Sequence, residues 1–131
     1  IKMKLVENIL RFEKHLEGAI RLKDKNISDY LVYNTLAMEC FQAVNALIEI
    51  GEYIVAKNKL GFPSSYREIF ELLEKSGFIT KNELEDAKRL VFLRNLIAHE
   101  YQRISEDELQ EMPDLLCKIR PFVDRTKEEG K

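Results

Sequence analysis

Apolar residues recur at intervals of three or four along almost the whole chain, and this periodicity restricts the fold more than any other feature. In the first segment Leu5, Ile9, Phe12, Leu16 and Ile20 keep this spacing and predict a helix of about five turns. Only five Gly and three Pro occur in 131 residues, which leaves little material for the turns between many short strands. The sequence therefore predicts an all-α, up-and-down bundle of four or five helices.

Capping residues set the expected helix boundaries. A second helix is predicted from Ser28 to about Lys57, with Asn26 or Ser28 as its N-cap, and Gly51 in its interior suggests a close helix crossing. Three pairs of a hydroxyl residue with a glutamate have the spacing of capping boxes and mark later starts: Ser65 and Glu68, Thr80 and Glu83, and Ser105 and Glu108.

The later helices are bounded by glycine and proline. Gly77 is expected to end a short third helix, and a fourth runs from about Lys81 to His99 or slightly beyond. The last helix begins near Glu106; Pro113 is expected to bend or restart it, and Pro121 to interrupt it again. We expect one domain over residues 1–131, with a frayed tail at residues 126–131.

Composition and charge limit the functional classes. A hydrophobic fraction of 45% and a charged fraction of 34% are typical of a folded protein without a membrane-spanning segment. A net charge of −2 argues against a general nucleic-acid coat, but it leaves room for a small basic site. Lys88, Arg89 and Arg94 lie in a stretch with no acid between Asp86 and Glu100, although this pattern also fits ordinary charge scatter.

Cysteine and histidine usage predicts no metal or cofactor. Cys40 and Cys117 lack a CxxC partner and metal-ligand spacing, so we expect free, buried thiols in a reducing cytoplasm. No His/Cys/Asp/Glu cluster has ligand spacing, and no glycine-rich phosphate loop occurs. The start of the chain is neither a signal peptide nor a membrane span, and His15 within it resembles an ordinary surface or rim histidine.

The fourth helix carries an arginine where apolar residues are expected. On a helical wheel six residues form one broad arc, with Arg94 near its middle: Leu84, Ala87, Leu90, Val91, Ile97 and Ala98. A guanidinium in a core costs several kcal/mol unless it is paired or reaches water. Glu39 and Glu49 are conceivable ion-pair partners, which would make Arg94 structural.

The opposite face of the fourth helix is also apolar, with Phe92, Leu93 and Leu96 where a surface helix would be polar. A helix that is apolar nearly all round is covered on both sides. A symmetric homodimer with this helix at or near the interface is the favoured cover. The alternative is that the second and last helices enclose it within one chain.

Arg94 and His99 also suggest chemistry on a phosphate. A guanidinium can bind a phosphate bidentately, and an imidazole transfers protons near neutral pH. On a straight helix the two residues lie about 140° and ~7.5 Å apart, so they converge only if the helix ends or bends, or if two chains pool residues. Asn95, one turn before His99, could orient its ring, and Tyr101 would share a face with Arg94. A structural pairing of Arg94 and His99 is the competing interpretation.

The motif "RNLIAHEY" resembles the signature of the HEPN superfamily, with Arg94, a polar Asn95, a spacer, His99 and Tyr101. The similarity extends through "IEIGEYI" and "SSYREIFELLEKSGFI" and is greatest to HepT-like proteins. It implies a dimeric helical bundle that acts as a metal-independent endoribonuclease toxin of a toxin–antitoxin pair. Arg94 would bind the phosphate, His99 would be the general acid/base, and Asn95 and Tyr101 would support the site.

The same resemblance implies a partner and a means of silencing. HepT-like toxins pair with a small nucleotidyltransferase antitoxin, and Tyr101 matches the hydroxyl that can accept AMP from it. The added AMP would fill the cleft that binds the RNA substrate. Alternatively, the chain would be a non-catalytic subunit that binds nucleotide, or presents Tyr101 to a nucleotidyltransferase. A purely structural helical dimer is the third possibility.

Overall fold

Helices make up nearly all of the chain, as the apolar periodicity predicts. A computed structural model of the protein describes residues 2–100 and 104–130, and no strand occurs among them. In chain order its elements are α1 (Lys2–Leu22), α2 (Tyr30–Lys57), α3 (Tyr66–Lys75), α4 (Lys81–Glu100), α5 (Glu106–Thr126) and the short 3-10 helix η2 (Lys127–Gly130). The prediction of an all-α bundle of four to five helices is confirmed.

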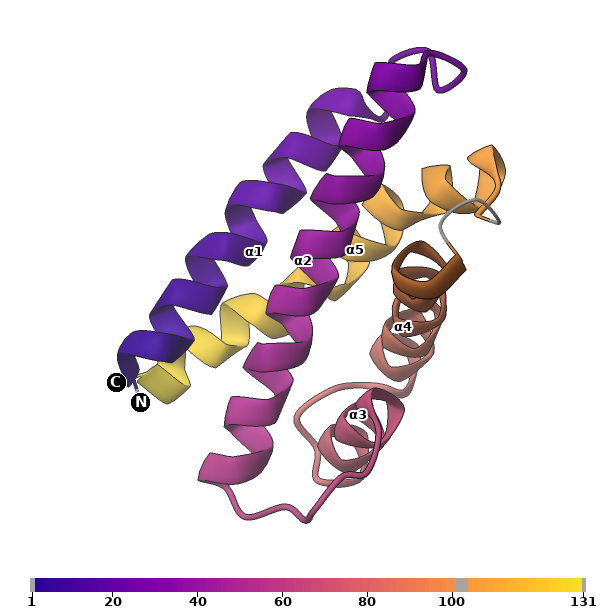
Figure 1. Cartoon of the computed structure of the whole chain (residues 1–131). Coiled ribbons are helices and arrows are strands. Elements are labelled where there is room, and N and C mark those ends of the chain that lie inside the picture. Colours follow the sequence, from indigo (N-terminus) through magenta and orange to yellow (C-terminus); the bar gives the residue numbers. More distant parts are fainter. Residues whose placement is uncertain (1, 101–103, 131) are drawn as a thin grey trace.

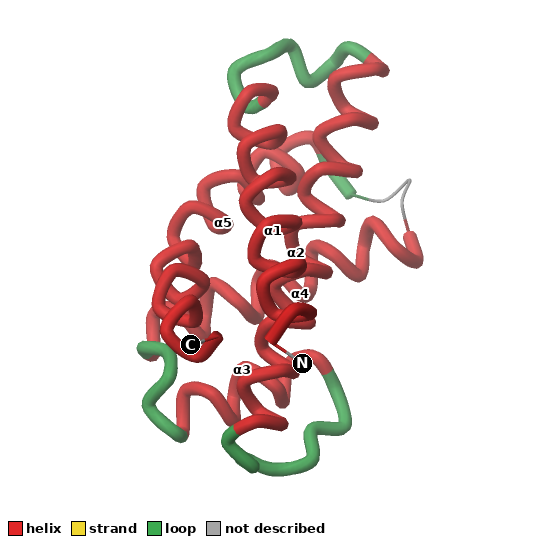
Figure 2. Tube along the Cα trace, turned by 90° about the vertical axis from the view of Figure 1, so that its left-hand side faces the viewer, coloured by secondary structure: helices red, strands yellow, loops and turns green. Residues whose placement is uncertain are grey.

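The two long helices α1 and α2 lie side by side and antiparallel, and they form the spine of the bundle (Figure 1). Helix α5 crosses behind this pair and contacts α1, α2 and α4. The short α3 packs against α2 and α4. The α1–α2 connection lies at one end of the bundle, and the α2–α3 and α3–α4 connections lie at the other (Figure 2).

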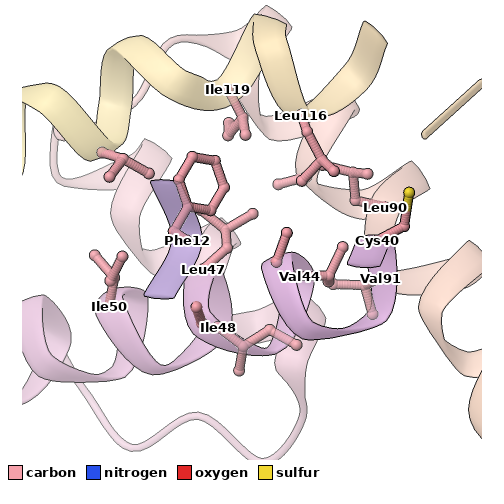
Figure 3. Packing of buried hydrophobic residues seen from close by; sticks show 14 of the residues in the cluster. Phe12, Cys40, Val44, Leu47, Ile48, Ile50, Leu90, Val91, Leu116 and Ile119 are labelled. Carbon is pink, nitrogen blue, oxygen red and sulfur yellow. The ribbon is translucent and has the colours of Figure 1, made fainter. Parts of the chain in front are cut away.

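One hydrophobic core joins the four long helices (Figure 3). Phe12 of α1, Leu47 of α2, Leu90 of α4 and Leu116 of α5 are all fully buried in it. Each such side chain contributes about 1.5–3 kcal/mol on burial, so the core holds α4 firmly against α2. This packing fixes the side of α4 that carries Arg94.

Gly51 lies where α2 crosses α3, as its place inside the helix suggested. A Cβ atom at this position would lie 2.9 Å from Cγ2 of Ile69, and Ile69 itself is buried. The absence of a side chain at Gly51 therefore lets α3 approach α2 closely. This contact packs α3 against the C-terminal third of α2.

Two helix starts differ from the sequence prediction. The N-cap of α2 is Asp29, whose carboxylate accepts hydrogen bonds from the backbone N–H groups of Leu31 and Val32, so the prediction of Asn26 or Ser28 is wrong. Aspartate caps as well as asparagine or serine, and the periodicity alone cannot place a start to within two residues. At α3 the capping box is incomplete, because the Glu68 side chain accepts from Ser64.

The other two capping boxes form as predicted. Thr80 and Glu83 exchange side-chain-to-backbone hydrogen bonds of 2.9 and 3.1 Å at the start of α4. Ser105 and Glu108 do the same at the start of α5. Gly77, with a φ of 84°, follows the last turn of α3, as expected for a residue that ends a helix.

Helix α5 continues through both prolines, so the predicted restart at Pro113 and interruption at Pro121 are wrong. Each proline removes one backbone donor, and burial of α5 against three other helices offsets this loss. Helical structure extends to Gly130, within the segment where fraying was expected. Thr126 ends α5, η2 follows, and Lys127 donates to Glu13 of α1 at 3.0 Å.

The cysteines are both free, but they differ in exposure. Cys40 is buried in the core, and burial, followed by the charge of neighbouring Glu39, raises the pKa of its thiol. Cys117 is exposed, so the expectation of two buried thiols is half wrong. Across the described part of the chain, no helix combines the length and the apolar character needed to cross a membrane.

Candidate functional site

Arg94 lies at the junction of three helices, half-buried in a polar and aromatic setting. Its Nε–H donates to Oδ1 of Asn45 on α2 at 2.8 Å, and its Nη1 donates to Oδ1 of Asn95 at 2.9 Å. The guanidinium also lies 5.0 Å from the ring centroid of Phe41 and 5.2 Å from that of Tyr66. Two amides and two aromatic rings thus fix its position without neutralising its charge.

The acids proposed as partners of Arg94 are paired elsewhere. Glu49 accepts from Arg11 at 2.9 Å, and Glu39 lies 2.7 Å from Nδ1 of His15. Both pairs join α1 to α2, so the structural ion pair suggested for Arg94 with either acid is wrong. Among the described side chains, residues 3–99 and 104–129, no ion pair involves Arg94.

The hydrogen bonds of Arg94 leave one edge of its guanidinium for a ligand. Asn45 occupies Nε and Asn95 occupies one side of Nη1, whereas Nη2 makes no hydrogen bond to the described residues. Nη1 and Nη2 together form the fork that binds two oxygens of a phosphate. This charged edge of the guanidinium, fixed in position by Asn45 and Asn95, is suited to bind an anion.

The surface beside Arg94 is hollowed into a groove of about 510 Å³, here called the Arg94 groove. It is formed by the start of α3 and the second half of α4, and its lining residues are Ser64, Ser65, Tyr66, Arg67, Val91, Arg94, Asn95 and His99. The lining includes two arginines and no acid. His99 is exposed on the last turn of α4.

Arg94 and His99 therefore line one groove although α4 is a single helix from Lys81 to Glu100. The groove extends along α4, and the helix ends one residue after His99, which is one of the conditions under which the two side chains were expected to converge on one small group. Their convergence on one group stays a prediction. Asn95 departs from its expected role, since its side chain accepts from Arg94 rather than orienting His99. Tyr101 lies outside the described residues.

A second hollow of about 590 Å³, here called the Phe92 groove, adjoins the first. It shares three lining residues with the Arg94 groove, and its full lining is Arg67, Glu85, Lys88, Arg89, Val91, Phe92 and Asn95. Lys88 pairs with Glu71 at 3.4 Å, and Arg89 pairs with Glu111 at 2.7 Å. The run of cations seen in the sequence is therefore largely neutralised outside the Arg94 groove.

The apolar face of α4 is mostly covered within the chain. Leu93, expected to need a second copy, is fully buried, and Leu96 is half-buried against the core. Only Phe92 of the three is strongly exposed, at 49%. Leu93 is therefore no evidence for a dimer. In the opposite sense, Ala98 was expected in the buried arc and is exposed at the end of the helix.

Four residues of the site were not singled out from the sequence: Phe41, Asn45, Tyr66 and Arg67. Their contacts with Arg94 or its groove depend on how α2 and α3 cross α4, which helical periodicity does not determine. Asn45 gave one usable signal, because it is a polar residue within the otherwise apolar run "AVNALI". Among the described residues no three His, Cys, Asp or Glu side chains are grouped to hold a metal ion.

A family model described as "Ribonuclease HepT-like" matches residues 5–114, most of the chain. The chain belongs to the HepT-like family. It is 30% identical over 79 residues to the mRNA nuclease HepT of Shewanella oneidensis, a match that covers 60% of this chain. The chain spans 59% of the length of that relative.

Solved structures share the HepT-like fold along nearly the full chain. A toxin–antitoxin complex with AMP-PNP has a TM-score of 0.87 at 22% identity and covers 95% of this chain and 98% of its own. A tri-AMPylated HEPN toxin of Shewanella oneidensis, in complex with its MNT antitoxin, has a TM-score of 0.86 at 23% identity, covering 95% and 97%. YutE of Bacillus subtilis, a cytosolic protein of unknown function, has a TM-score of 0.81 at 18% identity, covering 98% and 93%.

Proposed function

We propose that this HepT-like protein is the toxin of a toxin–antitoxin pair and cleaves RNA without a metal ion. The observation that carries the proposal is the guanidinium fork of Arg94, which lies in a groove that His99 also lines and that has no acid among its described lining residues. RNA brings a phosphodiester for the fork and a 2′-hydroxyl for an imidazole to deprotonate. The guanidinium of Arg94 and the imidazole of His99, which would act on these two RNA groups, line the same groove.

In the proposed reaction Arg94 binds the non-bridging oxygens of the scissile phosphate and stabilises the charge that develops on them. His99 takes the proton of the ribose 2′-hydroxyl, whose oxygen then attacks phosphorus. The bond from phosphorus to the 5′-oxygen breaks, and that oxygen takes a proton from water, so the products are a 2′,3′-cyclic phosphate and a 5′-hydroxyl. Asn95 and Asn45 keep the guanidinium in place, and Tyr101 supports the site.

The active form proposed is a homodimer whose two motifs share a cleft, with the exposed Phe92 close to the interface. The partner proposed is a nucleotidyltransferase antitoxin that transfers AMP to Tyr101. A nucleotide attached there would bring negative charge to the end of the Arg94 groove and compete with RNA phosphate. Such a pair would act in the cytoplasm.

The test of this proposal is growth inhibition combined with RNA cleavage by the purified protein. We expect His99→Ala to abolish both, while its melting temperature and oligomeric state stay unchanged, because the side chain is exposed. Full toxicity of His99→Ala would refute the assigned mechanism. The matched control is His15→Ala, which removes the other histidine from its pair with Glu39; neither residue lines the Arg94 groove.

A second candidate is a non-catalytic subunit that presents Tyr101 as an AMP acceptor to a nucleotidyltransferase. The feature that favours it is the net charge of −2, which provides little attraction for RNA. It predicts modification by the partner without RNA cleavage by the unmodified protein. Intact mass of the protein after co-expression with its neighbouring gene product, followed by a cleavage assay, separates the two candidates.

A further inference from the structure

The Arg94 groove and the Phe92 groove adjoin along α4. They share the lining residues Arg67, Val91 and Asn95. A ligand bound at Arg94 can therefore extend toward Phe92 without leaving the surface. A nucleotide chain has the extended shape that fits such a track.

Arg67 stands at the point where the grooves join, and it is exposed in the first turn of α3. Lys88 and Arg89 are held by Glu71 and Glu111, but no ion pair involves Arg67 within the described residues. Arg67 and Arg94 are thus the two arginines of the Arg94 groove, and each keeps its charge for a ligand. Two such cations along a track match two successive phosphates.

Phe92 provides an aromatic surface in the groove that Arg67 also lines. Its side chain is 49% exposed, and the guanidinium of Arg89 lies 5.4 Å from its ring centroid. Exposed aromatic rings next to arginines are the usual means of stacking the bases of single-stranded nucleic acid. A large exposed ring within a groove is costly in water and gains most from being covered by a base.

We infer that the Phe92 groove binds the nucleotide next to the scissile phosphate, with Arg67 on its phosphate and Phe92 against its base. This inference rests on the proposed ribonuclease function and adds a substrate-binding subsite to it. Because stacking and phosphate contacts read no base edge, the subsite selects single-stranded RNA rather than a particular sequence.

The test is the binding of a short single-stranded RNA by the full-length His99→Ala protein, in which cleavage cannot interfere. Adding Arg67→Gln is expected to weaken binding several-fold and to lower the slope of log K against log salt by about 0.7, the value for one phosphate contact on a single strand. Adding Phe92→Leu is expected to weaken binding about tenfold by removing the stacking surface. Phe92→Trp keeps an aromatic ring at this position and is expected to retain RNA binding.

Two matched controls lie outside the grooves. Arg120→Gln makes the same charge change at an exposed position of α5, and Leu10→Ala removes an exposed apolar side chain from α1. Neither is expected to alter binding. The melting temperature and oligomeric state of each variant are measured alongside, to separate loss of the subsite from loss of fold.

The outcomes distinguish this inference from the function on which it rests. RNA binding that survives both Arg67→Gln and Phe92→Leu unchanged, in a protein whose wild type cleaves RNA, overturns the subsite alone. Absence of both binding and cleavage in the parent proteins overturns the ribonuclease proposal and the subsite with it. If Phe92→Leu dissociates a dimer and its RNA affinity falls only for that reason, Phe92 is an interface residue and the inference is wrong.

Discussion

The contact between Asn45 and Arg94 allows a substitution that should separate activity from stability. Asn45→Asp replaces a neutral amide oxygen, which accepts the Nε–H of Arg94 at 2.8 Å, with a carboxylate of nearly the same shape. The variant would create an ion pair at a half-buried site and stabilise the fold by about 0.5–1 kcal/mol. The same charge would oppose any phosphate on the far edge of the guanidinium.

The size of that opposition follows from the geometry of the guanidinium. A carboxylate at residue 45 and a phosphate on the Nη1–Nη2 edge would lie ~7 Å apart, which gives a repulsion of about 2 kcal/mol at an effective dielectric constant of about 20. We therefore expect kcat/KM for RNA cleavage to fall about thirtyfold while the melting temperature does not fall.

The assay is cleavage of a fluorogenic RNA under kcat/KM conditions, paired with thermal unfolding. Asn34→Asp makes the same change on α2 at a half-buried position that does not line the Arg94 groove, and it should leave cleavage unchanged. Wild-type cleavage by Asn45→Asp would show that the free edge of Arg94 is not where the phosphate binds.

Three further predictions concern the fold and the modification site. Gly51→Ala should lower the free energy of unfolding by about 1 kcal/mol in a denaturant titration, since the new methyl would lie 2.9 Å from buried Ile69; an unchanged value would mean that α3 shifts freely. Burial raises the pKa of Glu83, but hydrogen bonds from Arg125 and Thr80 and the charge of Arg125 outweigh it, so the folded pKa is lowered. The stability from this pair is present above the ordinary glutamate pKa and lost as pH falls through the folded value, so Glu83→Gln should flatten the acid limb of a pH–stability curve. If the proposed AMP transfer takes place, Tyr101→Phe should prevent the mass increase in AMP units after co-expression with the proposed antitoxin, whereas Tyr30→Phe should not.

The sequence predicted the positions of the helices better than the way in which the helices pack against one another. Apolar spacing and capping pairs such as Thr80 with Glu83 are local signals, and they placed the helices closely. The start of α2 was missed because neighbouring Asn, Ser and Asp residues all cap well. The persistence of α5 through Pro113 could not be predicted, because it depends on burial by helices distant in sequence.

The site was predictable only as far as α4 alone could show it. The position of Arg94 within the apolar arc was visible from the wheel, but its partners were not. Asn45 and Phe41 lie about fifty residues earlier in the chain and meet Arg94 only through the α2–α4 packing. Charge alone suggested Glu39 and Glu49 as partners of Arg94. In the structure His15 and Arg11 of α1 pair with these two glutamates instead.

The most direct test of the chemistry at His99 and Arg94 is to identify the chemical groups at the ends of the RNA products that form in the presence of a chelator. The proposed mechanism predicts 2′,3′-cyclic phosphate ends from the unmodified wild-type protein, none from His99→Ala, and no cut at a position carrying a 2′-deoxyribose. Products with a free 3′-hydroxyl, or cleavage that requires an added divalent cation, would show that the 2′-hydroxyl is not the nucleophile and that the proposed mechanism is wrong.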